Sequence, residues 1–322
     1  MTVPAPLVGL DIGGTKTAAA LVGPDGKVLG RRLAPTPAGS GPAAVLDTAA
    51  RLARELLDPG GAGPVGVGTA GTVDPATGTI RYATDSLPGW SGTAVADELA
   101  ARLARPVRVT NDVNAAALGE SWAGAGRDRQ ELLLVAVGTG LGGAMLQHGR
   151  IFTGARGGAG EVGHLPAPGA ERLRCGCGRY GHLEGIASGT GLSAAYAVET
   201  GLRITGRTVA ERAAAGEPTA REVVDRAATA LGRTLAGLVA LLDPQAVVLA
   251  GGAADALLPG ARAALTAELP AAWADVPLLP AALGADSVVV GAARLAGHPG
   301  HGRQADGADG TPAVVTDERT RA

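Results

Sequence analysis

The chain of 322 residues has little cysteine, little aromatic surface and no long apolar run. It contains two Cys, and Phe, Trp and Tyr together make up only 2% of it. Secreted disulfide scaffolds are far richer in cysteine. No apolar stretch approaches the roughly 18 residues of a membrane helix. The N-terminus lacks the charged start and apolar core of a signal peptide, so we expect a cytoplasmic protein without membrane contact.

Basic surface is also lacking. Lys and Arg total 28 against 30 Asp and Glu, giving a net charge of −2, and no basic run occurs. A nucleic-acid partner is therefore not expected. The chain does have 52 Gly and a hydrophobic content of 46%. This composition and length predict a globular protein with one large α/β unit or two domains.

Short apolar strands alternate with helical patterns along the chain. Helical spacing predicts helices over 43–57, 93–104, 221–242 and 287–296. Two segments, "GLDIGGTKTAAAL" and "VAVGTGLGGAML", each read as strand, tight glycine turn and strand. They indicate two similar halves whose glycine turns point into a cleft, where bare backbone N–H groups approach phosphates. The polar, Gly- and Pro-rich segment 298–322 predicts a disordered tail.

Seven segments carry a family resemblance. They are "DIGGTKT", "GTAGTVDPATG", "LPGW", "NDVNAAALGE", "GTGLGGA", "GEVGH" and "CGCGRYGHLEG". Their order and spacing, from about Val8 to about Ala296, resemble the ROK family of sugar kinases and sugar-responsive repressors. The resemblance implies an α/β protein with the actin-like, hexokinase-like ATPase fold, in which two domains surround a cleft. We place the small domain at 3–111 plus about 286–297 and the large domain at 112–285.

The resemblance also implies the reaction and its partners. The implied reaction is phosphoryl transfer from ATP, with Mg²⁺, to a hexose. The implied assembly is a homodimer. We take glucose as the first choice of acceptor, giving glucose 6-phosphate. The alternatives are N-acetylmannosamine, N-acetylglucosamine and fructose. A sugar-sensing repressor is disfavoured, because only about seven residues precede the first strand and leave no room for a DNA-binding module. A sugar-binding protein without catalysis is disfavoured because Asp11 and Asp112 are both present.

Transfer to a sugar hydroxyl needs a general base near that hydroxyl. By resemblance the base is Asp112, which follows a predicted strand and precedes a helix. Its other interpretation is an N-cap for the helix that begins near Val113. The resemblance implies a set of sugar contacts: Asn111, Asp112, Glu161, His164 and Glu184. Without it, the two glutamates would be read as solvated loop carboxylates and His164 as a structural histidine.

Three glycine turns are predicted to bind the nucleotide and its phosphates. By resemblance Asp11 faces the magnesium and the transferring phosphate, while Lys16 contacts phosphate or lies on the surface. The turn residues are Gly13, Gly14 and Thr15, then Gly138, Thr139 and Gly140, and finally Gly251 and Gly252 on the adenosine side. Each glycine pair, taken alone, also fits an ordinary β-turn.

The two cysteines belong to a predicted metal site. The family holds a structural zinc with one His and a C-x-C-G-x-x-G-C segment, matched here by His164, Cys175 and Cys177. The third cysteine position is His182, which gives a His₂Cys₂ set that tetrahedral zinc accepts. The alternative is a lost site with two idle thiols. A disulfide between residues so close would be strained, and a redox pair is more often C-x-x-C.

The chain departs from the familiar sugar pocket before "LPGW". Many sugar-phosphorylating relatives have Asn at this position, whereas this chain has Ser86. The contact is therefore made by the serine hydroxyl, moved to Asp85, or lost. This departure affects the identity of the sugar more than the chemistry.

Overall fold

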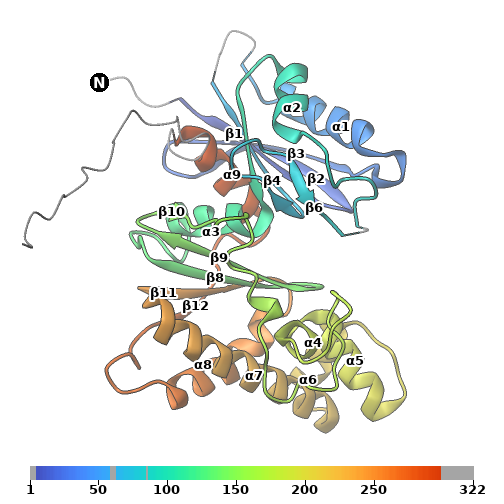
Figure 1. The fold of residues 1–322 in the computed structure, drawn as a ribbon, viewed down its shortest axis with the longest axis vertical. Helices are drawn as coiled ribbons and strands as arrows, with labels where there is room; N and C mark the ends of the chain where they lie inside the picture. The colour runs from blue at the N-terminus through green and yellow to red at the C-terminus, as the bar shows by residue number, and fades with distance from the viewer. Residues whose placement is uncertain (1–4, 59–62, 85, 299–322) are drawn as a thin grey trace, which may run out of the picture.

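The computed structural model describes residues 5–58, 63–84 and 86–298, and it has two stacked α/β halves (Figure 1). Each half is built on a five-stranded sheet. Asp85 and the predicted tail beyond His298 lie outside the described residues. Within these ranges, no helix has both the length and the hydropathy that a bilayer span requires.

The first sheet has the strand order β3-β2-β1-β4-β7. Its strands are β1 (Leu7–Ile12), β2 (Lys16–Val22), β3 (Val28–Pro35), β4 (Val65–Thr69) and β7 (Val107–Asn111). The first three form antiparallel hairpins, while β1, β4 and β7 run parallel. Every residue of β4 is buried, as expected for a central parallel strand covered on both faces. The 3₁₀ turn η1 (Ala38–Ser40) and the helices α1 (Pro42–Arg54) and α2 (Val95–Leu103) complete this half.

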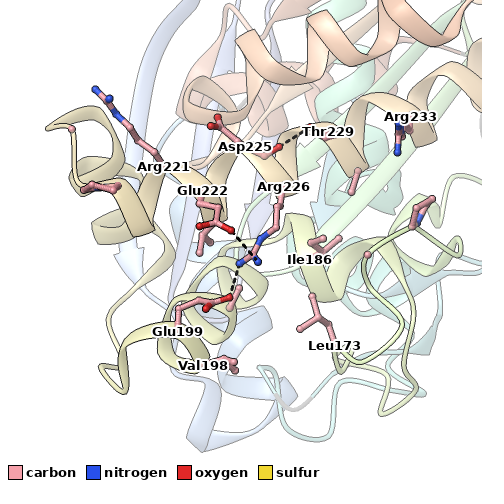
Figure 2. Close-up of a pocket in the computed structure, with 17 residues that line it drawn as sticks. Leu173, Ile186, Val198, Glu199, Arg221, Glu222, Asp225, Arg226, Thr229 and Arg233 are labelled. Atoms are coloured by element: carbon pink, nitrogen blue, oxygen red, sulfur yellow. Dashed lines mark hydrogen bonds and ion pairs between the residues drawn. The ribbon is translucent and has the colours of Figure 1, made fainter.

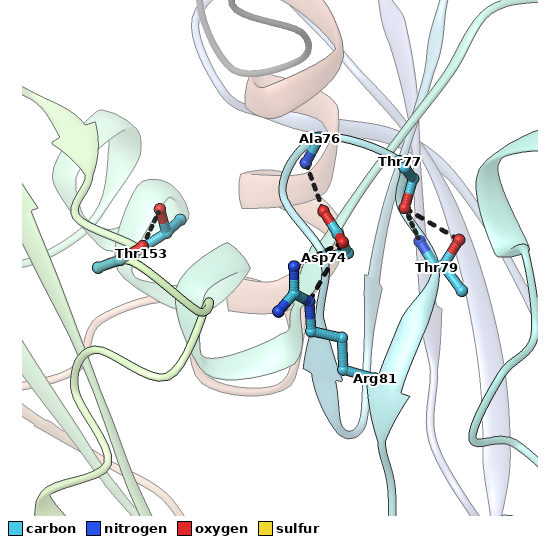
Figure 3. Close-up of polar contacts among 7 residues, drawn as sticks. Asp74, Ala76, Thr77, Thr79, Arg81 and Thr153 are labelled. Carbon is cyan, nitrogen blue, oxygen red and sulfur yellow. Dashed lines mark hydrogen bonds and ion pairs between the residues drawn. The ribbon is translucent and has the colours of Figure 1, made fainter.

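A separate hairpin projects from the first half. It consists of β5 (Thr72–Val73) and β6 (Ile80–Tyr82). Asp74 fixes its turn by accepting from the Ala76 N–H at 2.9 Å and pairing with Arg81 at 2.7 Å (Figure 3). The segment after β10 reaches this hairpin, because a Cβ on Gly157 would lie 2.6 Å from the Val73 carbonyl oxygen. The two halves therefore touch here as well as through their central helices.

The second sheet has the strand order β10-β9-β8-β11-β12. Its strands are β8 (Leu132–Val137), β9 (Leu141–Gln147), β10 (Arg150–Ile151), β11 (Ala246–Ala250) and β12 (Leu278–Pro280). The remaining elements of this half are η2 (Val162–His164), α4 (Leu183–Ala187), α5 (Gly189–Thr200), α6 (Gly206–Ala214), α7 (Pro218–Leu242) and α8 (Ala254–Glu268). Side chains of β8 alternate between two cores: Leu133 packs in the cluster of α7 and α8, and Leu134 in the cluster of α3.

Two helices form the layer between the sheets: α3 (Asp112–Ala123) and α9 (Ser287–Gly297), which follows η3 (Gly284–Asp286) (Figure 1). Helix α9 lies against the first sheet at backbone distance, since a Cβ on Gly66 would come within 1.7 Å of the Ala292 carbonyl oxygen. Helix α3 contacts α9 and both sheets. The domain division near 111/112 and 285/286 stays a prediction.

Most of the predicted elements are confirmed, with shifted ends. The helix predicted over 43–57 is α1, which ends at Arg54, and the one predicted over 221–242 begins earlier, at Pro218. Helices α4, α5, α6 and α8 were not predicted from the sequence.

Candidate functional site

Asp11 and Asp112 lie at one edge of the first sheet. Strands β1, β4 and β7 are parallel, and their register aligns Asp11 with Gly68 and Gly68 with Thr110. Asp112 follows β7 directly and begins α3. The two carboxylates therefore lie two strands apart at the carboxyl ends of the strands, the usual ligand edge of an open α/β sheet.

Asn111, not Asp112, caps helix α3. The Asn111 Oδ1 atom accepts hydrogen bonds from the N–H groups of Val113 at 2.8 Å and Asn114 at 3.3 Å. Its Nδ2 donates to the Gly71 carbonyl oxygen at 3.0 Å. The N-cap interpretation of Asp112 is wrong, because its neighbour already satisfies the helix terminus. Asp112 also accepts a hydrogen bond from the Val113 N–H, at 2.9 Å, but the helix terminus does not depend on it.

Both aspartates hold a proton more tightly than an ordinary Asp. Burial raises the pKa of Asp112 to about 6, against hydrogen bonds that lower it, and the charge of Glu161 adds to the rise. Burial also raises the pKa of Asp11 to about 6, followed by the charge of Asp112, while Lys16 and Arg31 oppose the shift. A base whose pKa lies just below the working pH is ionised yet accepts a proton readily.

The first glycine turn is packed under the segment that carries Ser86. The Gly13 N–H donates to the Lys16 carbonyl oxygen at 3.1 Å and closes the turn. A Cβ on Gly14 would lie 2.6 Å from the Ser86 carbonyl oxygen, so only glycine fits there. The Ser86 hydroxyl is 3.0 Å from the Thr84 Oγ1 atom. Ser86 thus lies beside the predicted phosphate turn, whose Thr15 and Lys16 are exposed.

The second and third glycine turns lie together. The Gly138 N–H donates to the Gly140 carbonyl oxygen at 3.0 Å, and the Thr190 hydroxyl donates to the Thr139 carbonyl oxygen at 2.8 Å. A Cβ on Gly251 would lie 2.3 Å from the Val137 carbonyl oxygen, so the turn after β11 is pressed against the end of β8. Parallel pairing of β8 and β11 brings these turns to one edge.

A pocket of about 510 Å³ opens beside these turns. It is lined by Gly138, Thr139, Gly189, Thr190, Ser193, Thr205, Gly206, Arg207, Gly252 and Ala253. Arg207 is the one cation in this lining, and it makes no hydrogen bond or ion pair with any described residue. Its position beside these turns was not predicted from the sequence. The sequence signal was weak: Ser188 and Thr205 each precede a helix and cap it.

The predicted zinc ligands converge. The Cys175 Sγ atom lies 3.5 Å from His164 Nδ1, and Cys177 Sγ lies 3.4 Å from His182 Nδ1. All four ligand atoms lie within 4.8 Å of one another. Tetrahedral zinc, with bonds of about 2.0–2.3 Å, needs separations of about 3.4–3.8 Å between ligand atoms. The residues therefore fit zinc after small side-chain rotations.

Glu184 links the loop that carries both cysteines to the second glycine turn. Its Oε1 atom accepts from the Gly176 N–H at 2.8 Å and the Cys175 thiol at 3.0 Å, and its Oε2 atom accepts from the Leu141 N–H at 3.1 Å. Burial favours the neutral acid, but these hydrogen bonds outweigh it and hold the pKa of Glu184 below its usual value. Burial raises the pKa of the Cys175 thiol to about 12. A metal must therefore displace this proton when it binds.

His164 lies between the two cysteines and Glu161. Its Nδ1 atom faces Cys175, while its Nε2 atom lies 4.0 Å from the Glu161 Oε2 atom. The two ring nitrogens are thus directed to different partners, which removes the conflict between metal ligation and a sugar contact.

A sequence model of the ROK family matches residues 7–298. The chain belongs to the ROK family. It is 32% identical to a glucokinase of Thermotoga maritima over 260 residues, which cover 76% of this chain and 81% of the relative. It is 36% identical to an N-acetylmannosamine kinase of Shigella boydii over 289 residues, which cover 89% of this chain and 97% of the relative.

A solved ROK structure has the same fold. It is a glucokinase from Streptomyces griseus in complex with glucose and AMPPNP, with a TM-score of 0.76 and 33% identity, covering 90% of this chain and 99% of that one. The predicted actin-like ATPase fold of the ROK family is therefore confirmed.

A larger hollow of this ROK protein lies away from the family motifs (Figure 2). It measures about 770 Å³ and lies between α5, α7 and the segment around Leu173. Leu173 and Ile186 form part of its apolar lining, and Arg226 pairs with Glu199 at 3.0 Å on its rim. It contains none of the predicted sugar or phosphate residues.

Proposed function

We propose that this ROK protein transfers the γ-phosphoryl group of ATP to a hydroxyl of a hexose, with glucose as the first acceptor and glucose 6-phosphate as the product. The observation that carries the proposal is the state of Asp112. Its helix is capped by Asn111, its pKa is raised to about 6, and it lies at the ligand edge two strands from Asp11. The names of the relatives, glucokinase and N-acetylmannosamine kinase, support the reaction class.

In the proposed reaction the Asp112 carboxylate takes the proton from the sugar hydroxyl. The hydroxyl oxygen forms a bond to the γ-phosphorus as the bond between that phosphorus and the β,γ-bridging oxygen breaks, and ADP leaves. Asn111 orients the start of α3, which carries the base. Backbone N–H groups of the turns at Gly13 and Gly138 hold the phosphates, and Asp11 would hold Mg²⁺. When bound, Mg²⁺ neutralises charge on the phosphates.

We propose that the sugar is bound by Asn111, Asp112, Glu161, His164 and Glu184. The Nε2 atom of His164 faces away from the cysteines and is available to a sugar hydroxyl. Each carboxylate would accept from a hydroxyl of the ring. Because one relative acts on glucose and another on N-acetylmannosamine by name, the acceptor is tested with a panel. ADP release is measured with glucose, mannose, fructose, N-acetylglucosamine and N-acetylmannosamine. Turnover on none of them would contradict the kinase and favour a sugar-sensing protein.

We also propose that His164, Cys175, Cys177 and His182 hold a structural zinc. The convergence of four ligand atoms within 4.8 Å supports this set. Zinc would immobilise the loop between Cys175 and His182. Glu184 would then help to fix the second phosphate turn, because it binds the N–H groups of both Gly176 and Leu141. Metal analysis of purified protein tests it, with one zinc per chain expected and a small fraction of one contradicting it.

A homodimer is the last part of the proposal. The hollow between α5 and α7 is suited to a second copy, because charges of both signs line it and a two-fold interface must be self-complementary (Figure 2). Val198 on its rim is 79% exposed and supplies an apolar contact. Sedimentation velocity of the wild type and of Val198→Asp tests it. We expect the wild type to sediment as a dimer and Val198→Asp as a monomer. A variant that remains a dimer would exclude this surface as the dimer interface.

A further inference from the structure

The two chain connections between the halves meet at one side chain. After α3 the chain passes to β8 through residues 124–131, and after β12 it returns to α9 through residues 281–286. Glu120, in the last half of α3, lies where these connections approach each other. Its side chain is fully buried, with a relative exposure of 0%.

The Glu120 carboxylate accepts three hydrogen bonds, all from backbone N–H groups. Ala125, on the first connection, donates to Oε2 at 2.8 Å. On the second connection, Ala282 donates to Oε2 at 3.0 Å and Leu283 to Oε1 at 2.9 Å. No Lys, Arg or His forms an ion pair with Glu120 in the described part of the chain. A buried carboxylate held in this way depends on its backbone donors for stabilisation.

The neighbouring glycines are shaped around this carboxylate. A Cβ on Gly124 would lie 2.0 Å from the Glu120 Oε2 atom, so any side chain there would displace it. A Cβ on Gly119 would lie 2.3 Å from the Ser287 carbonyl oxygen, where α9 begins. These contacts give a structural reason for the "GE" at the end of the "NDVNAAALGE" segment. Neither residue is among the proposed sugar or phosphate contacts.

The groups of the proposed reaction lie on both sides of these connections. Helix α3 begins with Asp112, and α9 packs on β1, where a Cβ on Gly9 would lie 1.9 Å from the Val289 carbonyl oxygen. Beyond the connections lie β8 and the turn at Gly138. Along the chain, the path from α3 to the second sheet and the path back to α9 run through residues 124–131 and 281–286.

We propose that Glu120 is a positioning residue that ties both connections into one pivot. It keeps Asp112 in register with the second phosphate turn as the halves close over sugar and ATP. The catalytic consequence rests on the proposed kinase function, while the pivot itself does not. An amide at this position cannot accept all three hydrogen bonds, because its NH₂ group would face either the N–H of Leu283 or the N–H groups of Ala125 and Ala282.

Glu120→Gln tests the pivot, with Gly124→Ala as a second variant that displaces the carboxylate sterically. The matched control is Tyr196→Phe, which removes another buried polar contact, the hydroxyl that donates to Glu217 at 2.5 Å in the second half. Three measurements are made on each protein: thermal unfolding, hydrogen exchange of segments 121–131 and 279–290, and steady-state kinetics.

We expect Glu120→Gln and Gly124→Ala to speed exchange in both segments together. We expect kcat to fall by about 10- to 100-fold, the cost of a misplaced reacting group, with the KM for sugar changed by less than about 3-fold. Tyr196→Phe should lower the unfolding temperature without either effect. A loss of stability alone would not move kcat of the folded enzyme.

The pivot is overturned if exchange rises in only one segment or in neither. The positioning role is overturned if folded Glu120→Gln keeps the wild-type kcat, or if Tyr196→Phe loses kcat equally. If Glu120→Gln does not fold, Gly124→Ala decides by the same criteria. If both segments exchange faster together but the wild type phosphorylates no hexose, the pivot is supported and the proposed function is wrong.

Discussion

Asp11 lies near the end of β1 and Asp112 directly follows β7, two strands away in the same parallel set, and the charge of Asp112 helps to raise the pKa of Asp11 to about 6. In the register, Gly68 of β4 lies between Asp11 and Thr110, two residues before Asp112. Neighbouring strands lie about 4.8 Å apart, so β1, which carries Asp11, and β7, which leads into Asp112, lie about 10 Å apart. This spacing leaves room for the transferring phosphoryl group of the proposed reaction between the two carboxylates.

The rate should depend on pH through these two carboxylates. Asp112 must be ionised to accept a proton, and burial raises its pKa to about 6. We therefore expect kcat/KM for the sugar to rise with pH through about 6 and then level off. Glu161→Gln should move the acid limb to lower pH, because the charge of Glu161 helps to raise the pKa of Asp112. A profile that is flat between pH 5 and 7 would contradict the assignment.

Asp112→Asn should stabilise the protein without ligands. The folded-state pKa of about 6 exceeds the ordinary value of 3.8, so the folded state binds the proton more tightly. The free energy of unfolding therefore falls as pH rises from about 4 to 6, and the full cost of the buried charge remains above 6. Removing that charge should add about 1–3 kcal/mol at neutral pH and little near pH 4. Thermal unfolding at both pH values checks this, and equal effects at the two would contradict it.

Arg207→Ala should weaken binding of the phosphoryl donor. Its unpaired guanidinium lines the pocket beside the second and third glycine turns. Loss of one charged hydrogen-bonding group should raise the KM for ATP by about 10-fold or more, with the KM for sugar within about 2-fold. Arg203→Ala is the matched control, since Arg203 is exposed nearby but outside the pocket lining. Equal effects of the two substitutions would assign Arg207 no special role.

Replacing His182 should show whether this side chain is a zinc ligand. The His182 Nδ1 atom lies 3.4 Å from the Cys177 Sγ atom, so we expect His182→Ala to lower zinc affinity by more than about 10-fold. His182→Cys restores a thiolate at the same position and should retain one zinc per chain. Competition with a chelator, followed by metal analysis, measures both. Equal zinc retention by the wild type and His182→Ala would show that His182 is not a ligand.

The sequence could predict the groups that lie close to glycine turns and strand ends. Local patterns of a few residues predict the turn at Gly13, whereas the roles of Asp112 and of the cluster around Cys175 come from the resemblance to the ROK family. The positions of the other groups depend on packing between residues that are far apart in the sequence. Arg207 reaches its pocket only because α5 and α6 begin side by side, where a Cβ on Gly206 would lie 2.3 Å from the Gly189 carbonyl oxygen. Glu120 takes two of its three hydrogen-bond partners from residues more than 160 positions further along the chain.

Capping of α3 shows the limit of local patterns. Asn and Asp are nearly equivalent as N-caps, so the sequence "ND" does not say which residue caps the helix. The structure gives that role to Asn111, whose Nδ2 atom also binds the Gly71 carbonyl oxygen from the next strand connection. Because that tertiary contact holds Asn111 as the N-cap, Asp112 is not needed for capping.

The central claim is that Asp112 is the base in phosphoryl transfer to a hexose. The most direct measurement is a single-turnover assay of phosphoryl transfer from labelled ATP to glucose, comparing the wild type with Asp112→Asn at saturating substrates. We predict glucose 6-phosphate from the wild type and a rate at least about 100-fold lower from the variant, with glucose binding retained in calorimetry. A variant rate near that of the wild type would contradict the account.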